Sequence, residues 1–185
     1  MRIFVTFLIA IGLIVLVFIL ILKGFGSGSK NQVLPKPITS YATTNAIAEL
    51  TLDGPVNYNG KHLSVQINID QYQTQINIIQ GYQGQVTNTQ AYPNNQNAYA
   101  VFLRSIGTEG FMNGNPDSTI TDDRGICPFG NRYVYQLVDG SQTIERYWST
   151  SCGSQGSFKG NSVAVNSLFK AQIPNYNQLT ENIVF

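Results

Sequence analysis

An unbroken apolar run over residues 3–22, without a charged side chain, constrains this chain more than any other feature. In a helix that rises about 1.5 Å per residue, the run is long enough to cross the roughly 30 Å hydrocarbon core of a bilayer. Signal-peptide apolar regions are shorter, about 7–15 residues, and end near a small-residue cleavage site. Here the run stops at Lys23 without such a site. We therefore expect an uncleaved transmembrane anchor over 1–23; a signal peptide cleaved among the small residues at 24–29 is the alternative.

The charges beside this run do not settle its orientation. Arg2 precedes the run and Lys23, Lys30 and Lys36 follow it, so the positive-inside rule does not favour an outside C-terminus. However, the tail before the run is only two residues long, which favours an N-in signal-anchor. The rest of the chain also holds two cysteines placed as a disulfide pair would be. We expect a single-pass protein of the cell membrane with its C-terminal domain extracytoplasmic.

After the anchor, residues 24–38 are rich in Gly, Ser and Pro and have the composition of a tether. Residues 39–185 are enough to bury a core, so we expect one β-rich domain there. Only 11% of the chain is Lys, Arg, Asp or Glu, and the net charge is +1. Because nucleic-acid binding needs a dense basic patch, we expect no nucleic-acid partner. The surface is instead made polar by amides, since Asn and Gln together number 33.

Alternating apolar and polar residues predict a half-buried strand over 63–70, and residues 46–53 are typical of another strand. From Tyr72 the apolar residues occupy the other parity, so a turn or bulge must lie near residues 70–71. A weaker strand is expected around 86–92. The apolar tail Ile183, Val184 and Phe185 can add a terminal strand.

If the chain makes a tight hairpin at residues 70–71, Gln66 lies opposite Gln75 and Asn68 lies opposite Gln73 on one face. The other face is then consistently apolar, which supports pairing. However, Asp-Gln is a poor two-residue turn because neither residue favours positive φ. A single long strand with a bulge is therefore an equal alternative.

A second hairpin is predicted over 132–149, where two strand-like segments flank Asp139-Gly140, a favoured type I′ turn pair. Cys127 lies twelve residues before Asp139, and Cys152 lies twelve residues after Gly140. A hairpin extended through this length places the two cysteines opposite one another, within disulfide reach, although the Pro and Gly between Cys127 and the strand should disturb that end. We therefore predict a Cys127–Cys152 disulfide.

Two helices are expected, each with an asparagine at its start. Asn95 is a candidate N-cap for a helix that runs to Ile106, and Asn161 or Ser162 for a helix that ends near Gln172. The side chains expected to face the core are Ala98, Val101, Phe102 and Ser105 in the first helix, and Val165, Leu168 and Phe169 in the second. The fold class predicted is α+β, a mainly antiparallel sheet with about two helices, preceded by one transmembrane helix.

No group of residues has the spacing of a catalytic or cofactor site, and we expect no cofactor. His62, the single histidine, lies beside a turn signal and is expected to be solvated. The loop at 113–123 carries oxygen ligands at alternating positions, as calcium loops do. Ser118, however, replaces the turn glycine, and Arg124 stands where a bidentate Glu should be. We therefore expect a polar loop with Asx turns and no metal.

Aromatic and amide side chains indicate a recognition surface. Tyr147 and Trp148 are neighbours in the second predicted hairpin, so they point to opposite faces and one of them should be exposed. Gln66, Gln73 and Gln75 lie in the first. These five residues are the candidate binding surface; the alternative is that the aromatics are ordinary core and rim residues.

The segments CPFGNRYVYQLVDG, ERYWSTSCG, GSFKGN and VNSLFKAQIPNY, all within 127–176, resemble single-pass membrane-anchored surface proteins of Saccharibacteria-type bacteria. The resemblance brings no activity with it. It implies a bacterial cell envelope as the place where this chain acts.

Together these features predict a membrane-anchored extracytoplasmic protein and favour a role other than catalysis. Its domain is expected to bind a protein or glycan partner at the cell surface, or to serve the envelope structurally. The alternative is an extracytoplasmic hydrolase or inhibitor-like domain. Glycoside hydrolysis needs two carboxylates, and Glu49, Asp70, Glu109 and Glu145 are acidic residues that no motif links.

Overall fold

The computed structural model describes residues 36–57, 62–115, 117–153 and 156–183, which belong to one compact unit, Lys36–Phe185. This unit begins before the boundary expected at residue 39, because Ile38 is buried in it. The apolar run at 3–22 lies outside the described residues. Within the described ranges, no helix is long and apolar enough to cross a membrane.

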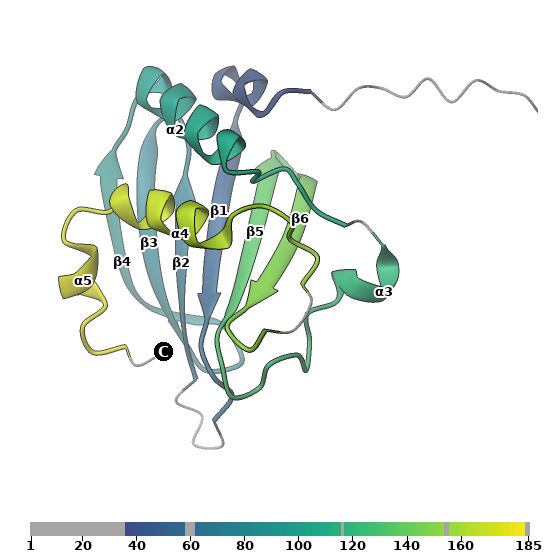
Figure 1. Ribbon diagram of the computed structural model, residues 1–185. Helices are drawn as coiled ribbons and strands as arrows, with labels where there is room; N and C mark the ends of the chain where they lie inside the picture. Colours follow the sequence, from purple (N-terminus) through teal and green to yellow (C-terminus); the bar gives the residue numbers. More distant parts are fainter. Residues whose placement is uncertain (1–35, 58–61, 116, 154–155, 184–185) are drawn as a thin grey trace, which may run out of the picture. The chain divides into compact units, whose positions relative to one another are not determined.

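Six strands form one antiparallel sheet in the order β4-β3-β2-β1-β5-β6 (Figure 1). After β4, at one edge, helix α2 and the segment with α3 carry the chain back across the sheet to β5, which pairs with β1. The elements are η1 (Ile38–Thr43), β1 (Ala46–Asp53), β2 (Leu63–Ile69), β3 (Gln73–Gln80), β4 (Gln85–Pro93), α2 (Gln96–Thr108), α3 (Ser118–Thr121), β5 (Arg132–Asp139), β6 (Gln142–Thr150), α4 (Ser162–Ala171) and α5 (Tyr176–Leu179).

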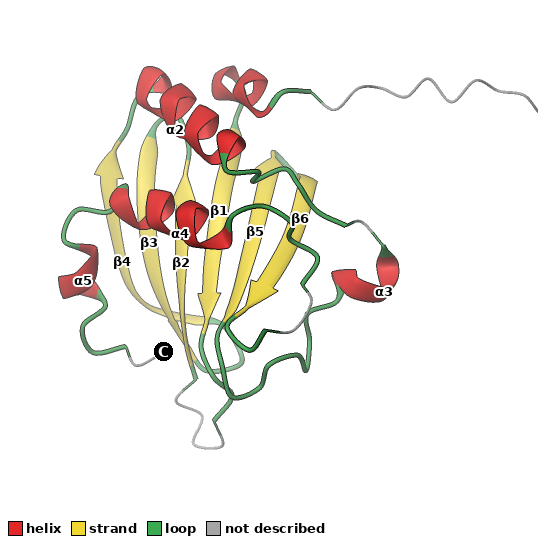
Figure 2. Ribbon diagram, viewed as in Figure 1, coloured by secondary structure: helices red, strands yellow, loops and turns green. Residues whose placement is uncertain are grey.

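Helices α2 and α4 lie across one face of the sheet, and the core fills the space between these layers (Figure 2). Strand β1 shows the pattern most clearly, since its residues alternate between buried and half-buried along the whole strand. The α+β class with a mainly antiparallel sheet is thus confirmed, and the structure adds the short elements η1, α3 and α5 to the two expected helices. Ile183 is in no strand, and residues 184–185 lie outside the described residues.

Helix α2 begins as predicted but buries a different stripe. The Asn95 side chain accepts a hydrogen bond from the backbone N–H of Ala98 at 3.0 Å, which is an N-cap. Val101, expected in the core, is 62% exposed. The helix is turned so that the Tyr99 hydroxyl donates to the Ala46 carbonyl at 2.9 Å. The residues it buries are Tyr99, Phe102, Leu103 and Ile106.

Helix α4 follows the prediction. The Asn161 side chain accepts from the backbone N–H of Ala164 at 3.1 Å, so Asn161 is the N-cap. Val165 and Phe169 are buried and Leu168 packs against the core.

Strands β2 and β3 form a hairpin, so the bulged single strand is wrong. The turn is one residue later than expected: the Asp70 carboxylate accepts from the N–H groups of Tyr72 at 2.6 Å and Gln73 at 2.8 Å, an Asx turn. As a result, Asn68 lies opposite Gln75, and Gln66 lies opposite Asn77. Each strand residue keeps its expected face, because its partner moves by two positions.

The β5–β6 hairpin also has another register than expected. Asp139 lies opposite Gln142, so the turn is Gly140-Ser141, with Gly140 at φ 61°. A bulge between Leu137 and Val138 shifts the pairing further. A hairpin extended at this register would not bring the cysteines opposite one another.

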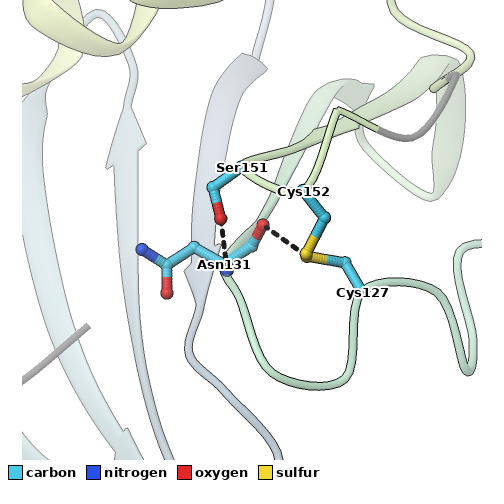
Figure 3. Close-up of a disulfide and its surroundings, with 4 residues drawn as sticks. All are labelled: Cys127, Asn131, Ser151 and Cys152. Atoms are coloured by element: carbon cyan, nitrogen blue, oxygen red, sulfur yellow. Dashed lines mark hydrogen bonds between the residues drawn. A yellow bond between two sulfur atoms is a disulfide. The ribbon is translucent and has the colours of Figure 1, made fainter.

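The predicted Cys127–Cys152 disulfide is nevertheless confirmed, with a Cα–Cα distance of 5.8 Å (Figure 3). A turn brings Cys127 back to the hairpin: Cys127 has φ 53°, and the N–H of Gly130 donates to its carbonyl at 3.2 Å. A Cβ at Gly130 would lie 2.7 Å from both sulfurs, so the bond requires glycine there. Asn131 and Ser151 join the two strands beside it, since the N–H of Asn131 donates to Ser151 Oγ at 2.9 Å.

Candidate functional site

The face of the sheet opposite the helices carries amide side chains over strands β2 and β3. Gln73 is exposed, Gln66, Asn68 and Gln75 are half-buried, and Asn77 at the centre is buried at 6% exposure. Residues on this face alternate with core residues along β2 and β3, and cross-strand pairs keep them together. Within strands β1 to β4, Glu49 and Asp53 are the charged residues. We call the following residues the amide face: Gln66, Asn68, Gln73, Gln75, Asn77 and Thr89.

Hydrogen bonds run through the amide face from strand to strand. The Gln75 amide donates to Asn77 Oδ1 at 2.8 Å, and Thr89 on β4 donates to the same oxygen at 2.9 Å. The Asn77 amide in turn donates to Gln66 Oε1 on β2 at 3.3 Å. Gln73 donates to Gln75 at 3.4 Å, so the chain of amides reaches the end of β3. These bonds hold the side chains in one arrangement with donors and acceptors across three strands.

Glu49 on β1 borders this network, directly opposite Asn68 on β2. Burial raises the pKa of the Glu49 carboxyl above its ordinary value, because removal from water disfavours the charged form. The Asn68 side-chain oxygen is buried and has no hydrogen-bond partner. The raised pKa means that Glu49 keeps its proton to a higher pH than a carboxyl in water does.

Sequence reasoning placed Gln66, Gln73 and Gln75 on a binding surface, and the structure brings these three together. It missed Asn77, which accepts or donates in three of the bonds, and Thr89 on the next strand. The signal was present in the alternation of β3, where Asn77 shares the parity of Gln73 and Gln75.

Trp148, by contrast, is not available at the surface. It points to the same side of the sheet as the amide face, but residues 117–131, which we call the cover segment, close over it. The indole N–H donates to the Ile120 carbonyl at 2.7 Å, and Trp148 is 2% exposed. Trp148 is therefore not exposed to a partner, because a distant loop packs over it.

Ion pairs fasten the cover segment to the strands. Arg146 on β6 donates to Asp123 Oδ1 at 2.7 Å and to the Thr121 carbonyl at 3.3 Å. Arg132 on β5 donates to the Asp123 carbonyl at 3.0 Å. Asp123 is thus a structural group, and its neighbour Asp122 pairs with Arg124 at 2.6 Å.

Tyr147 points to the helix side and is buried in the core. Its ring lies against Gly114, where an added Cβ would come within 2.1 Å of the ring carbons. Burial raises the pKa of the Tyr147 hydroxyl, with Glu145 as a further cause. Tyr147 and Trp148 do point to opposite faces, but both are covered, so neither belongs to a binding surface.

His62 is buried at 5% exposure, so the expectation of a solvated histidine is wrong. Its Nε2 lies 2.7 Å from Asp53 Oδ1, its Nδ1 lies 3.2 Å from the Pro55 carbonyl, and its ring stacks on Tyr82. Arg132 donates to the other oxygen of Asp53. Both ring nitrogens lie within hydrogen-bond distance of an oxygen, one of Asp53 and one of Pro55. In this arrangement His62 has no free nitrogen to act as a base.

The acidic loop holds its own backbone in the way expected of a polar loop. Asn115 accepts from the N–H of Asp117 at 2.9 Å and Asp122 from the N–H of Arg124 at 3.0 Å, two Asx turns. In the described part of the chain, no group of three or more His, Cys, Asp or Glu side chains is placed to hold a metal ion.

Two surface hollows lie beside the helices, and neither contains a carboxylate. The first, of about 610 Å³, is lined by Ser167, Lys170, Ala171, Asn175, Tyr176, Asn177 and Gln178. The second, of about 390 Å³ between α2 and α4, is lined by Asn97, Ala98, Val101, Phe102, Ser105, Leu168 and Gln172.

No protein-family model matches the chain, and a search of curated proteins finds no match either. Function must therefore be argued from the amide face itself.

Proposed function

We propose that this chain is a single-pass membrane protein that holds a binding domain outside the cytoplasm, and that its amide face recognises an uncharged glycan. The apolar run at 3–22 has the length and composition of a membrane span. A disulfide between Cys127 and Cys152 persists where thiols are oxidised, which supports an extracytoplasmic domain. The resemblance to surface proteins of Saccharibacteria-type bacteria supports a bacterial envelope.

The observation that carries the glycan proposal is the hydrogen-bonded amide network on the sheet face opposite the helices, in which buried Asn77 holds Gln66, Gln75 and exposed Thr89 in place. Amide groups offer both donors and acceptors, which is what the hydroxyl groups of a sugar require. The network fixes these groups before a ligand arrives, so less side-chain freedom is lost on binding. Glu49 at the border of this face has a raised pKa and keeps its proton to a higher pH than a carboxyl in water does.

A protein partner fits this face less well. Protein interfaces are held by buried Trp, Tyr and Arg anchors. Here Tyr147 and Trp148 are buried inside the domain. Amide and hydroxyl groups without aromatic anchors favour a polar, solvated ligand.

A hydrolase is also a weaker candidate. The carboxylates of Asp53 and Asp123 are engaged by arginine and histidine side chains, which hold them in place. Glu49 stands among neutral amides, and the two hollows beside the helices contain no acid. General acid and base chemistry on a sugar needs two carboxyl groups across a substrate site.

Glycan-array and calorimetric measurements on the soluble unit 36–185 test the proposal. We expect binding to neutral glycans that is insensitive to salt, because the face has little charge to screen. Gln75→Ala removes one donor and one acceptor and should weaken binding about tenfold, the effect of losing about 1.4 kcal/mol of hydrogen bonding. Gln142→Ala, an exposed glutamine at the β5–β6 turn, is the matched control and should bind as the parent does.

Capture of a protein instead of a glycan, or binding that Gln75→Ala leaves unchanged, would refute the assignment. Placement is tested separately with the full chain in intact cells. Membrane-impermeant amine reagents should label lysines of the unit 36–185. Mature protein found in the cytosol with reduced thiols would overturn the envelope placement.

A further inference from the structure

The two edges of the sheet use their backbone groups differently. At β6, the segment 156–158 lies along the strand: the N–H of Phe158 donates to the Trp148 carbonyl at 2.9 Å, and the N–H of Trp148 donates to Ser157 Oγ at 3.0 Å. A charged Glu-Arg pair lies in the same strand. This edge is therefore partly closed to any other strand.

Strand β4 is the opposite edge, and no described segment pairs with its outer side. All of its residues except Tyr92 are exposed, and the sequence QVTNTQAYP contains no charge. Natural proteins block such edges with Lys, a covering loop or a very short strand. A long, neutral and uncovered edge is a template for another strand.

The ladder to β3 identifies which backbone groups point outward. The N–H of Asn94 donates to the Tyr72 carbonyl at 2.8 Å, so the backbone N–H and C=O groups of Asn94 point toward β3. Along an antiparallel strand the backbone groups of successive residues point alternately toward one neighbour and the other. Those of Gln90, four residues before Asn94, therefore also point toward β3. Thr89 and Ala91 therefore present their N–H and C=O groups to the free edge.

Two features limit the free ladder to the middle of β4. Pro93 has no N–H, so it cannot donate at one end. At the other end the pairing with β3 shifts register between Ile78 and Ile79, opposite the stretch around Thr87. A pairing strand is therefore centred on Gln90, between the two outward-facing residues.

We propose that a second copy of this chain occupies this edge, through an antiparallel contact of the two β4 strands about a two-fold axis at Gln90. Thr89 of one copy then lies opposite Ala91 of the other, and symmetry repeats the pair, so every outward N–H of these residues finds a carbonyl. A neutral strand can pair with itself in this way because no like charges meet across the axis. Strand β4 meets this condition along its whole length.

The contact joins the two sheets into one, with both amide faces on the same side. It buries less than a standard interface of about 1,600 Å², so the dimer should form where chains are concentrated, as on a membrane surface. This inference concerns assembly and does not depend on the ligand of the amide face.

Cysteine cross-linking of the full chain in its membrane tests the pairing. Cys127 and Cys152 are occupied by their own disulfide. In Gln90→Cys the new thiols meet across the axis, so mild oxidation should give a covalent dimer of most of the protein on a non-reducing gel. Asn88→Cys, two residues along the same strand and on the same side, is displaced from its copy and should stay monomeric. No dimer from Gln90→Cys, equal cross-linking at both positions, or a cross-link to another protein would overturn the proposal.

A second variant removes the edge itself. Thr89→Pro in the Gln90→Cys background deletes an outward N–H and leaves the β3 ladder intact, so the dimer yield should fall several-fold. The melting temperature should fall only slightly, because the variant also loses the hydrogen bond from Thr89 to Asn77 Oδ1. An unchanged yield from folded Thr89→Pro protein would refute the pairing, and if this variant does not fold, the comparison of positions 90 and 88 decides alone. A monomeric chain that still binds glycan would refute the pairing and leave the proposed function standing.

Discussion

Replacing Cys127 and Cys152 together with alanine should lower the free energy of unfolding by about 3.5 kcal/mol. The disulfide closes a loop with a sequence separation of 25 residues. In the chain-entropy model, closing a loop of this length removes about 12 cal/mol/K from the unfolded chain, which is about 3.5 kcal/mol at 25 °C. The loop contains the whole β5–β6 hairpin, so the bond limits how far that hairpin can open when the protein unfolds.

The folded state should change little, because other contacts hold the same ends together. The N–H of Ser151 donates to the Asn131 carbonyl at 2.9 Å, and the N–H of Asn131 donates back to Ser151 Oγ at 2.9 Å. Ser151→Ala is the matched control, since it removes one of these bonds and leaves the disulfide; it should cost about 1 kcal/mol.

Urea unfolding of the unit 36–185 measures both variants. Trp148 is the single tryptophan and is buried at 2% exposure, so its fluorescence reports the loss of the cover segment, while far-UV circular dichroism reports the sheet. Coincident transitions would show that the cover and the sheet unfold together. A loss below about 1 kcal/mol for the double alanine variant would refute the reasoning, because the hairpin ends would then already be close in the unfolded chain.

Two further substitutions follow from single contacts. Glu49→Gln should stabilise the fold at neutral pH: the folded state raises the pKa of this carboxyl, so stability is greatest while Glu49 is protonated and falls as pH rises from the unfolded pKa through the folded one. Urea unfolding across this pH window should show that decrease in the parent and a weaker one in Glu49→Gln; parallel curves would contradict it. Asn95→Ala removes the N-cap of α2 and should cost about 1 kcal/mol in the same assay, whereas Asn97→Ala, an exposed neighbour in the first turn, should cost less.

The elements of this fold could be read from the sequence wherever local periodicity decides them. Strand β1 and the cap Asn95 were predicted at the positions the structure shows, and the cap of α4 is Asn161, one of the two residues predicted for it. The hairpin registers could not be predicted in this way, because the hydrogen bonds of the turn residues set them. In the β2–β3 turn, the Asp70 side chain accepts hydrogen bonds from two backbone N–H groups and moves the turn by one residue. The disulfide was predicted on the assumption that the β5–β6 register continues to the cysteines and places them opposite one another. The observed register is shifted and bulged, and a separate turn at Cys127 brings the two cysteines together instead.

The candidate site was predicted only where its residues lie in one hairpin. Gln66, Gln73 and Gln75 share a face because strand alternation places them there. The burial of Trp148 and His62 depends on contacts outside their own strand or turn. The partner of Trp148 is 28 residues away, and the partner of His62 is the Asp53 carboxylate at the end of β1. No local sequence pattern identifies such a partner. Trp148 and His62 were therefore expected at the surface, although both are buried.

The distribution of charge connects the cover, the amide face and the free edge. Asp53 and Asp123 pair with Arg132 and Arg146, so these charges fasten the cover segment and one end of the sheet. The strands on the other side of β1 are left with amides and hydroxyls to contact water. This makes the amide face a surface of hydrogen-bonding groups, and it leaves β4 without the charges that normally keep edge strands apart. The lack of charged side chains on these strands thus has two consequences. It favours a neutral ligand on the amide face, and it permits β4 to pair with the β4 strand of a second copy. Placing a lysine at Gln90 separates the two consequences. The two lysines would meet across the axis and repel one another, while the side chain of residue 90, which pairs with buried Ile76, lies on the face away from Gln66 and Gln75.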